Sequence, residues 1–518
     1  MAVRHMPGST EGGWSRRDFT ALLLAGASSG CATQGGKPAE PVAAGLTFDP
    51  ARFTTRQVTA GGQTVTVRAY EGLPVVSRPV EAAHQAINLY IPEAYFRGEP
   101  VGRYTARSAP IFLPNQVGGY MPALPGTPDG RMGPPLPPGT PVPPSAMAVA
   151  LTRGFVVASP GARGRTQQAA DGRWTGKAPA AIVDLKAAVR WLHHNAGRLP
   201  GNTERIISNG TSAGGALSAL LGASGNSPDY AAELQAVGAA PGRDDIFAVS
   251  AYCPITNLAQ ADAAYEWQFR GLDSYRNVNI SMLDFKVQRQ EVTRQLSAAE
   301  LALSAQLQAD FASYVNKLGL RDPQGRLLQV AADGGGSLQA HVEALLLVSA
   351  QQALDAGQDL SALRWLRVQD GRVRALDFAG CVRAAGRMKA LPAFDGLALE
   401  TGENQLFGDA STDKRHFTAF SARHSQVPGA GLVDARTVQR MDAMHQAGDR
   451  RNRAAAHWRI RHGAVDRDTA FAVPVLLAAA LRARGLDVDL ALPWGQGHGG
   501  DYDLDALFAW IDQRVAAG

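Results

Sequence analysis

The sequence is poor in cysteine, in lysine and in clustered positive charge. Its 518 residues include only three cysteines, and seven of its 51 basic residues are lysines. Cys31, Cys253 and Cys381 show no metal-ligand spacing and cannot all pair, which excludes a disulfide framework. No run of five basic residues occurs, and the net charge of +5 is dispersed along the chain. A surface that binds nucleic acid is therefore not expected.

Long apolar runs are also missing. A permanent membrane span needs about 20 consecutive apolar residues, and no stretch near the N-terminus reaches that length. The composition is nevertheless that of a packed globular protein, with 45% hydrophobic and 19% charged residues. The length predicts either two to four domains or one large α/β domain with an insertion.

The N-terminal 31 residues are typical of a twin-arginine export signal. Arg16 and Arg17 precede a short apolar stretch at 21–27 and then a run of small residues that ends near Cys31. The segment before Cys31 resembles a lipoprotein cleavage box, except that Ser28 stands where Leu is usual. We expect a periplasmic or secreted protein, with a lipid tether at Cys31 as one alternative and an ordinary unstructured N-terminus as another.

Apolar periodicity predicts strands that alternate with helices, and therefore a largely parallel sheet covered on both faces. The expected strands are 64–67, 87–91, 111–113, 155–157, 205–208, 458–460 and 488–490, and the expected helices are 182–192, 216–221, 473–481 and 504–511.

A different pattern separates the two parts of this α/β core. Residues 256–446 contain long helical stretches, such as 282–318 and 338–356, and no convincing strand. We predict a first core part at 46–255, an inserted and mostly helical lid domain at 256–446, and a second core part at 447–518. The proline-rich segment 122–144 is expected to be a long surface loop with polyproline II character.

The candidate nucleophile is Ser212. Gly210-Thr211-Ser212-Ala213-Gly214 fits the G-x-S-x-G nucleophile elbow, in which glycines allow a sharp turn from a strand into a helix. The pattern alone is weak, because it also occurs at 26–30 inside the signal segment. The predicted strand before Ser212 and the predicted helix after it supply the context that the elbow requires.

A serine nucleophile needs a base and a carboxylate that orients the base. Asp466 and Asp468 follow the predicted strand 458–460, and His498 follows the next strand in a glycine-rich loop. The carboxyl ends of parallel strands carry functional groups in open α/β sheets. We predict Ser212, Asp466 and His498 as the catalytic residues, with His462 as a rival base and a mobile surface histidine as the alternative for His498.

The predicted oxyanion hole uses backbone amides. The strand 111–113 runs into Pro114-Asn115-Gln116-Val117-Gly118-Gly119-Tyr120, at the position where such folds place the second donor. The candidates are the N–H of Ala213 and that of Gly118 or Gly119. A plain glycine turn is the alternative for the Gly118–Gly119 pair, since the chain has 56 glycines.

Several strings in the chain resemble the bacterial tannases, which have an α/β-hydrolase core and a large inserted lid. The strings are Pro114-Asn115 to Met121, the run from Gly210 to Ser218, Tyr252 to Leu258, Tyr265-Glu266-Trp267, and His457 to Gly463. The resemblance covers most of the chain after the signal segment. It implies hydrolysis of galloyl esters of tannins and simple gallate esters through an acyl-enzyme, with no metal or organic cofactor.

The resemblance also implies a gallate-binding trio, which falls on Lys389, Glu403 and Asp468. Carboxylates accept hydrogen bonds from phenolic hydroxyls, and an ammonium stabilises phenolate character. The alternative is a structural salt bridge within the lid between Lys389 and Glu403, since such pairs are often of no functional consequence. The chain departs from the family in its 122–144 loop, in Ala213 where Gly is frequent, and in a divergent lid.

Two other functions remain open from the sequence. One is a related aryl carboxylesterase, such as an enzyme that acts on ferulate esters. The other is a catalytically silent hydrolase fold that serves as a binding protein, which fold resemblance alone does not exclude. The expected partner is a small aryl ester.

Overall fold

The computed structural model describes residues 45–130, 144–283 and 286–517. The predicted signal segment, Cys31 and most of the proline-rich loop lie outside these residues. In the part of the chain that the structure describes, no helix is both long enough and apolar enough to cross a bilayer.

A nine-stranded mixed sheet forms the centre of the protein, in the order β1-β2-β3-β5-β4-β6-β7-β12-β13. β1, β2, β3 and β5 pair antiparallel in turn, and every pairing from β5 to β13 is parallel. The strands are β1 (Thr54–Ala60), β2 (Gln63–Pro74), β3 (Ala86–Pro92), β4 (Pro110–Pro114), β5 (Val156–Pro160), β6 (Asn202–Thr211), β7 (Ala248–Tyr252), β12 (His457–Arg461) and β13 (Asp487–Ala491).

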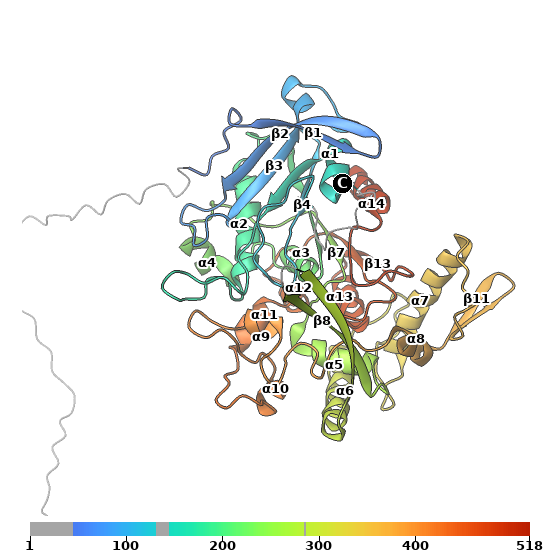
Figure 1. Cartoon of the computed structure of the whole chain (residues 1–518). Helices are drawn as coiled ribbons and strands as arrows, with labels where there is room; N and C mark the ends of the chain where they lie inside the picture. The colour runs from blue at the N-terminus through green and yellow to red at the C-terminus, as the bar shows by residue number, and fades with distance from the viewer. Residues whose placement is uncertain (1–44, 131–143, 284–285, 518) are drawn as a thin grey trace, which may run out of the picture. The chain divides into compact units, whose positions relative to one another are not determined.

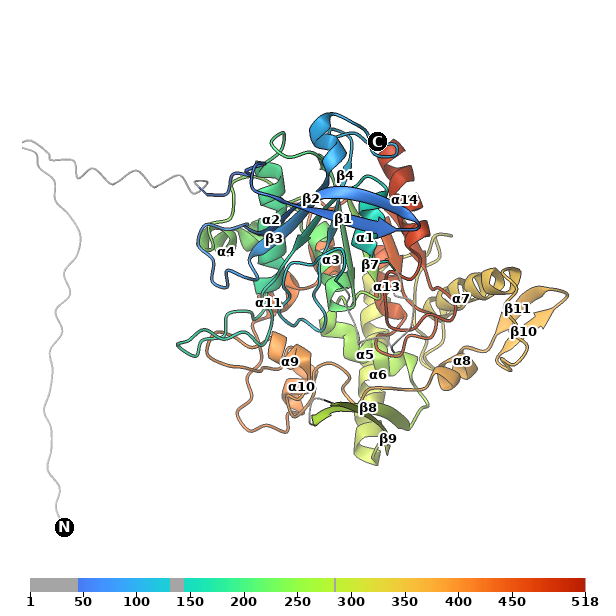
Figure 2. The ribbon, with the colours of Figure 1, turned by 45° about the horizontal axis from the view of Figure 1, so that its top comes forward.

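Helices cover both faces of this sheet (Figure 1). Every residue of β3, β4, β5 and β7 is buried, as expected for strands with helices on both sides. α1 and α14 lie together, as Figure 2 also shows. α2, α3, α13 and the short helix α12 (Ala443–Gly448) form a second packed group. The core helices and turns are η1 (Glu93–Arg97), α1 (Ala146–Thr152), α2 (Ala180–His194), α3 (Ala213–Ala223), η2 (Pro228–Tyr230), α4 (Ala231–Ala236), α13 (Ala472–Ala483) and α14 (Leu504–Ala517).

This arrangement confirms the predicted α/β-hydrolase fold. All seven predicted strands lie within the sheet, whereas β1 and β7 are not among them. Each of the four predicted helices of the core is also present.

The segment between β7 and β12, residues 253–456, is inserted between two adjacent parallel strands, and we call it the insertion. It is mostly helical, with α5 (Leu258–Gln268), α6 (Ala298–Leu318), α7 (Ser337–Asp355), α8 (Phe378–Ala385), α9 (Gly402–Leu406), α10 (Ala419–Arg423), α11 (Ala435–Arg440) and α12 (Ala443–Gly448).

The prediction that the insertion has no strand is wrong. It contains two antiparallel hairpins, β8 (Ser274–Leu283) with β9 (Lys286–Gln295) and β10 (Leu366–Gln369) with β11 (Arg372–Leu376). The predicted helix 282–318 therefore begins only at Ala298. Gln, Arg and Glu in β9 favour a helix locally, but pairing with β8 overrides that preference.

Candidate active site

Ser212 lies at a sharp turn between β6 and α3. Its backbone has φ 58° and ψ −124°, a conformation that is strained for a residue with a side chain. The turn depends on its glycines, because a Cβ on Gly214 would come within 2.6 Å of the Val117 carbonyl oxygen, and one on Gly210 would collide with the Gly214 carbonyl. The predicted strand–turn–helix context is present.

The structure brings the three predicted catalytic side chains into one hydrogen-bonded line. His498 Nε2 lies 2.8 Å from Ser212 Oγ, and His498 Nδ1 lies 2.9 Å from Asp466 Oδ2. Asp466 also accepts a hydrogen bond from the amide of Asp468 at 2.7 Å. A base that contacts the nucleophile and is itself oriented by a carboxylate is the geometry that nucleophilic catalysis requires.

Three loops of the core position this line. Gly463 lets the loop that carries Asp466 approach the loop that carries His498, since a Cβ there would collide with the carbonyls of Gln496 and Gly497. The amide of Val465 donates to Gln496 at 3.0 Å. The base and its carboxylate are thus fixed by backbone contacts between neighbouring strand ends.

The charges around His498 favour its protonated form. Burial lowers the pKa of His498, but the hydrogen bond with Asp466 and the charges of Asp466 and Asp468 outweigh burial and hold that pKa above its usual value. Burial raises the pKa of Asp466, and His462 and His498 more than offset this, so that pKa is lowered. Asp466 therefore stays ionised and stabilises an imidazolium at His498.

His462, the rival base, is not part of the hydrogen-bonded line Ser212–His498–Asp466. Its ring is fully buried, 3.7 Å from Asp466, and packs edge-on against Phe471. Burial is the main cause that lowers the pKa of His462. An imidazole enclosed in this way has no route to the nucleophile.

One group of metal-ligating side chains overlaps the same site. Ligand-type atoms of Cys253, Asp466 and His498 all lie within 4.8 Å of one another. A thiolate, a carboxylate and an imidazole together suit a borderline divalent cation such as Zn²⁺. Here the imidazole and the carboxylate are bonded to each other, so a cation would have to break the Asp466–His498 contact.

The loop predicted to hold the oxyanion donors lies against the elbow. Asn115 donates to the carbonyl of Gly214 and to Ser218, both at 3.0 Å. Ala213 is the first residue of α3, where an N–H has no partner within the helix. The participation of Ala213 and of Gly118 or Gly119 in an oxyanion hole stays a prediction.

The structure joins two of the three predicted gallate-binding residues across the boundary between insertion and core. Lys389 Nζ donates to Asp468 Oδ1 at 3.0 Å and lies 3.8 Å from the centre of the Phe394 ring. The alternative salt bridge of Lys389 with Glu403 is not found among the described residues, where the ion pair of Lys389 is with Asp468. Asp468 in turn lies 3.9 Å from His498 Nε2, which places this pair beside the nucleophile.

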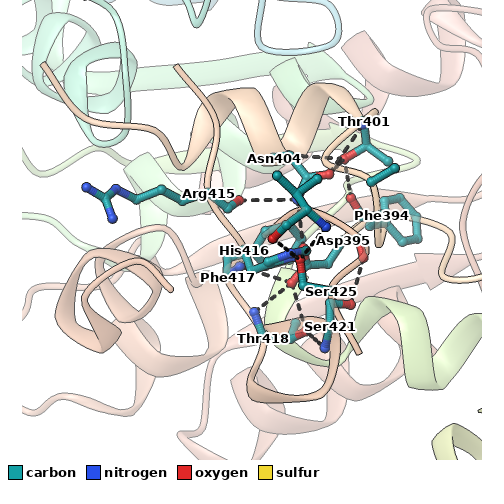
Figure 3. A network of polar contacts seen from close by, with 12 residues as sticks. Phe394, Asp395, Thr401, Asn404, Arg415, His416, Phe417, Thr418, Ser421 and Ser425 are labelled. Atoms are coloured by element: carbon teal, nitrogen blue, oxygen red, sulfur yellow. Dashed lines mark hydrogen bonds and ion pairs between the residues drawn. The ribbon is translucent and has the colours of Figure 1, made fainter. Parts of the chain in front are cut away.

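Glu403 is the third member and lies in the first turn of α9. Burial raises the pKa of Glu403, and the charges of Lys389 and Arg165 oppose that rise. Its helix is held by a buried network around Asp395, which Figure 3 shows. Asp395 accepts from Asn404 at 2.7 Å and from Thr418, and His416 contacts it at 2.8 Å.

Residues that no motif marks also connect this site. Arg165 donates from Nε to the Gly119 carbonyl at 2.9 Å, and its other end bonds to Gln405 of α9. It thereby links the Gly118–Gly119 loop to the helix that bears Glu403. Arg165 is 46 positions from Gly119 and 240 positions from Gln405 in the chain, so no local sequence pattern reveals this link.

The fold and this arrangement of side chains define an α/β-hydrolase, and the family model described as BD-FAE matches residues 142–302. Among solved structures, tannase from Lactobacillus plantarum is 44% identical over 91% of this chain and 100% of its own, with a TM-score of 0.85. Fusobacterium nucleatum tannase is 43% identical over 91% of this chain and 99% of its own, with a TM-score of 0.84. The chain therefore belongs to the tannase family of carboxylic ester hydrolases.

Two further proteins are similar to this chain. A tannin acyl hydrolase solved in complex with ethyl gallate is 45% identical over 90% of this chain and 98% of its own, with a TM-score of 0.83. Esterase LipC of Mycobacterium tuberculosis is 44% identical over 62 residues. That match spans only 12% of this chain and 14% of LipC.

Proposed function

We propose that the protein hydrolyses galloyl esters through a covalent acyl-enzyme on Ser212. The observation that carries the proposal is the hydrogen-bonded line Ser212–His498–Asp466 with the Lys389–Asp468 pair beside it. The similarity to a tannin acyl hydrolase solved with ethyl gallate supports the choice of acyl group.

Acylation begins with attack of Ser212 Oγ on the ester carbonyl carbon while His498 Nε2 takes the hydroxyl proton. The N–H groups of Ala213 and of Gly118 or Gly119 stabilise the oxyanion of the tetrahedral intermediate. When the bond to the alcohol oxygen breaks, His498 returns the proton to the leaving alcohol. A galloyl ester of Ser212 remains.

Deacylation repeats the proton transfers with water. His498 Nε2 accepts a proton from the water as its oxygen attacks the acyl carbon, and then protonates Ser212 Oγ as that oxygen leaves. Asp466 holds the imidazole by its Nδ1–H throughout and stabilises the imidazolium. The products are gallic acid and the free enzyme.

Lys389, Glu403 and Asp468 would bind the hydroxyls of the galloyl ring. A buried carboxylate that accepts a phenolic O–H is left without a partner when the substrate lacks that hydroxyl, which disfavours such substrates. In this proposal the insertion acts as a lid that supplies two of the three groups, while the core supplies Asp468.

The test is a panel of methyl gallate, methyl protocatechuate, methyl ferulate and 4-nitrophenyl acetate. Lys389→Ala and Glu403→Ala are expected to lower kcat/KM on methyl gallate by about 10- to 1000-fold and to change acetate hydrolysis little. Ser212→Ala is expected to lower turnover of every ester by about 10⁴- to 10⁶-fold.

Matched controls come from the same insertion. Glu400 lies three residues before Glu403 and is exposed, and Lys317 is an exposed lysine at the end of α6. Glu400→Ala and Lys317→Ala should leave all four esters unchanged. Equal losses on gallate and acetate would make the trio structural. Preference for ferulate in the wild type would favour the aryl carboxylesterase, and inertness on all esters would favour the binding protein.

The N-terminal sequence supports a second proposal, that the protein is exported by the twin-arginine route to the periplasm or beyond. The support is Arg16-Arg17 with Phe19 ahead of a short apolar stretch. If the lipoprotein cleavage box is recognised even though Ser28 replaces the usual Leu, Cys31 would be the site of lipid attachment.

A further inference from the structure

Tyr265-Glu266-Trp267 stands out in the sequence but has no part in the reaction described above. These residues lie near the end of α5, in the insertion, and all three side chains are fully buried or nearly so. Their contacts lead to the segment 387–390 and to the loop that carries Asp468.

The hydroxyl of Tyr265 joins the two chain segments that bear the Lys389–Asp468 pair. It accepts hydrogen bonds from the amides of Met388 and Lys389, each at 3.1 Å. It donates to the carbonyl of Arg467, the residue before Asp468, at 2.9 Å. A single oxygen atom is thus hydrogen-bonded to the insertion, through Met388 and Lys389, and to the core, through Arg467.

Glu266 secures the same segment by a second route. Its carboxylate holds Arg387 with two hydrogen bonds of 2.7 and 2.5 Å and also accepts from Ser304 at 2.7 Å. Arg387 then donates from Nε to the carbonyl of Lys389 at 2.9 Å. The amide and the carbonyl of Lys389 are therefore both anchored by this motif.

Because its backbone is held at both ends, the Lys389 side chain has a fixed origin from which to reach Asp468. The Tyr265 ring is itself held by Phe269, at 4.5 Å between ring centres, and by the edge of Phe394. Phe394 is also the ring beneath the Lys389 ammonium. A shift of the Tyr265 hydroxyl would alter the spacing of Lys389 and Asp468 directly.

We propose that Tyr265 is a positioning residue for acyl-group selection, whose hydroxyl sets the spacing between Lys389 and Asp468. The proposal rests on the proposed galloyl specificity, because it assigns how two of the binding groups are held. It gives Tyr265 no contact with the reacting atoms, so the chemistry at Ser212 should not depend on it.

The experiment is Tyr265→Phe, which keeps the ring and removes only the hydroxyl. We expect KM for methyl gallate to rise about tenfold, with kcat changed less than about twofold, and hydrolysis of 4-nitrophenyl acetate to stay within about twofold of wild type. Melting temperature and near-ultraviolet circular dichroism are measured alongside. A loss shared equally by both esters would overturn the proposal, as would an unchanged KM for methyl gallate.

Tyr230→Phe is the matched control. Tyr230 is a fully buried core tyrosine whose hydroxyl donates to the carbonyl of Arg440 in the insertion, so it too links the core to the insertion. Its removal should leave the ratio of gallate to acetate hydrolysis unchanged. An equal change in that ratio for Tyr230→Phe would show that any lost link between core and insertion has the same effect, which would overturn the specific role of Tyr265.

A double-mutant cycle with Lys389→Ala separates positioning from independent binding. If Tyr265 acts through Lys389, adding Tyr265→Phe to Lys389→Ala should cause little further loss on methyl gallate. Fully additive losses would contradict the proposal. Should Tyr265→Phe fail to fold, Glu266→Gln tests the same anchor. This substitution weakens the hold of Arg387 on Lys389 and should raise KM for methyl gallate selectively. If KM for methyl gallate does not rise selectively, the proposal is contradicted.

The wild-type and Lys389→Ala measurements separate a failure of the proposed galloyl specificity from a failure of the proposed role of Tyr265. If the wild type does not prefer methyl gallate, or Lys389→Ala leaves that preference intact, the proposed acyl specificity fails. If both behave as expected and Tyr265→Phe does not, only the positioning role fails.

Discussion

At the scale of single residues, Asp466 and Asp468 lie two positions apart and face different partners. Asp466 contacts His498 Nδ1, whereas Asp468 contacts the ammonium of Lys389. The sequence identified both carboxylates and assigned the first to the base and the second to the substrate. Only the folded loop shows which oxygen meets which partner, because neighbouring side chains of a turn point in different directions.

The charges at His498 predict how activity depends on pH. The pKa of His498 is raised, chiefly by its hydrogen bond to Asp466 against the opposing effect of burial, and only the neutral imidazole accepts the proton of Ser212. We therefore expect kcat/KM to rise with pH and its acid limb to lie above the ordinary histidine value of about 6.5. The measurement is kcat/KM on methyl gallate from pH 5 to pH 10.

Asp466→Asn should move the acid limb of the kcat/KM profile to lower pH, because the carboxylate is the main group that raises the pKa of His498. The substitution should also lower the maximal rate by about 10⁴-fold. Asp468→Asn serves as the comparison and should impair gallate more than acetate. A nearly full rate in Asp466→Asn together with an inactive Asp468→Asn would reverse the assignment of the two carboxylates.

At the scale of secondary-structure elements, α9 shows how a short helix places one side chain. Glu403 lies in the first turn of α9, and the cap of the helix is Thr401, whose hydroxyl accepts from the amide of Asn404 at 3.1 Å and donates to the carbonyl of Phe394. A five-residue helix has little stability of its own, so its cap and the Asp395 network hold it in place.

Thr401→Ala should therefore cost stability and selectivity together. Loss of an N-cap hydroxyl costs about 1 kcal/mol, and the displaced first turn would carry Glu403 with it. We expect a modestly lower melting temperature and a loss of about 3- to 30-fold in kcat/KM on methyl gallate, by the conversion of about 1.4 kcal/mol per tenfold change, with acetate hydrolysis nearly unchanged.

Ser297→Ala is the control for this element. Ser297 caps α6 in the same insertion by a capping box with Glu300. It should cost a similar amount of stability without changing the gallate-to-acetate ratio. If the two variants behave alike toward both esters, α9 has no special part in acyl recognition.

The elements also show where local pattern is sufficient and where it is not. Seven of the nine strands of the sheet and the four predicted core helices follow from the apolar pattern. Strands that are buried on both faces read as short apolar runs, and helices that are buried on one side show a period near 3.6 residues. The β8–β9 hairpin does not, because its pairing joins residues up to 21 positions apart, Ser274 with Gln295, and overrides the helical preference of β9.

At the scale of the whole molecule, the proposed export signal predicts where the protein works. Replacing both Arg16 and Arg17 by Lys should leave the precursor in the cytoplasm, because the twin-arginine route reads the arginine pair. The measurement is the distribution of the protein between cytoplasmic and exported fractions. A variant with only Arg450 and Arg451 changed to Lys, far from the signal, should be exported normally. Normal export of the Arg16–Arg17 variant would contradict the proposal.

The sequence by itself determined the elements that depend on short spacing: the alternation of strands and helices, the glycine-flanked turn at Ser212, and the strand ends that carry Asp466 and His498. These follow from local sterics and from the order of parallel strands, so reading along the chain is enough. The tertiary structure alone decided that Lys389 pairs with Asp468 and not with Glu403, and that Tyr265 bridges their two segments. Those contacts join residues 79 to 202 positions apart. Their partners are chosen by the packing of the insertion on the core, which no local pattern encodes.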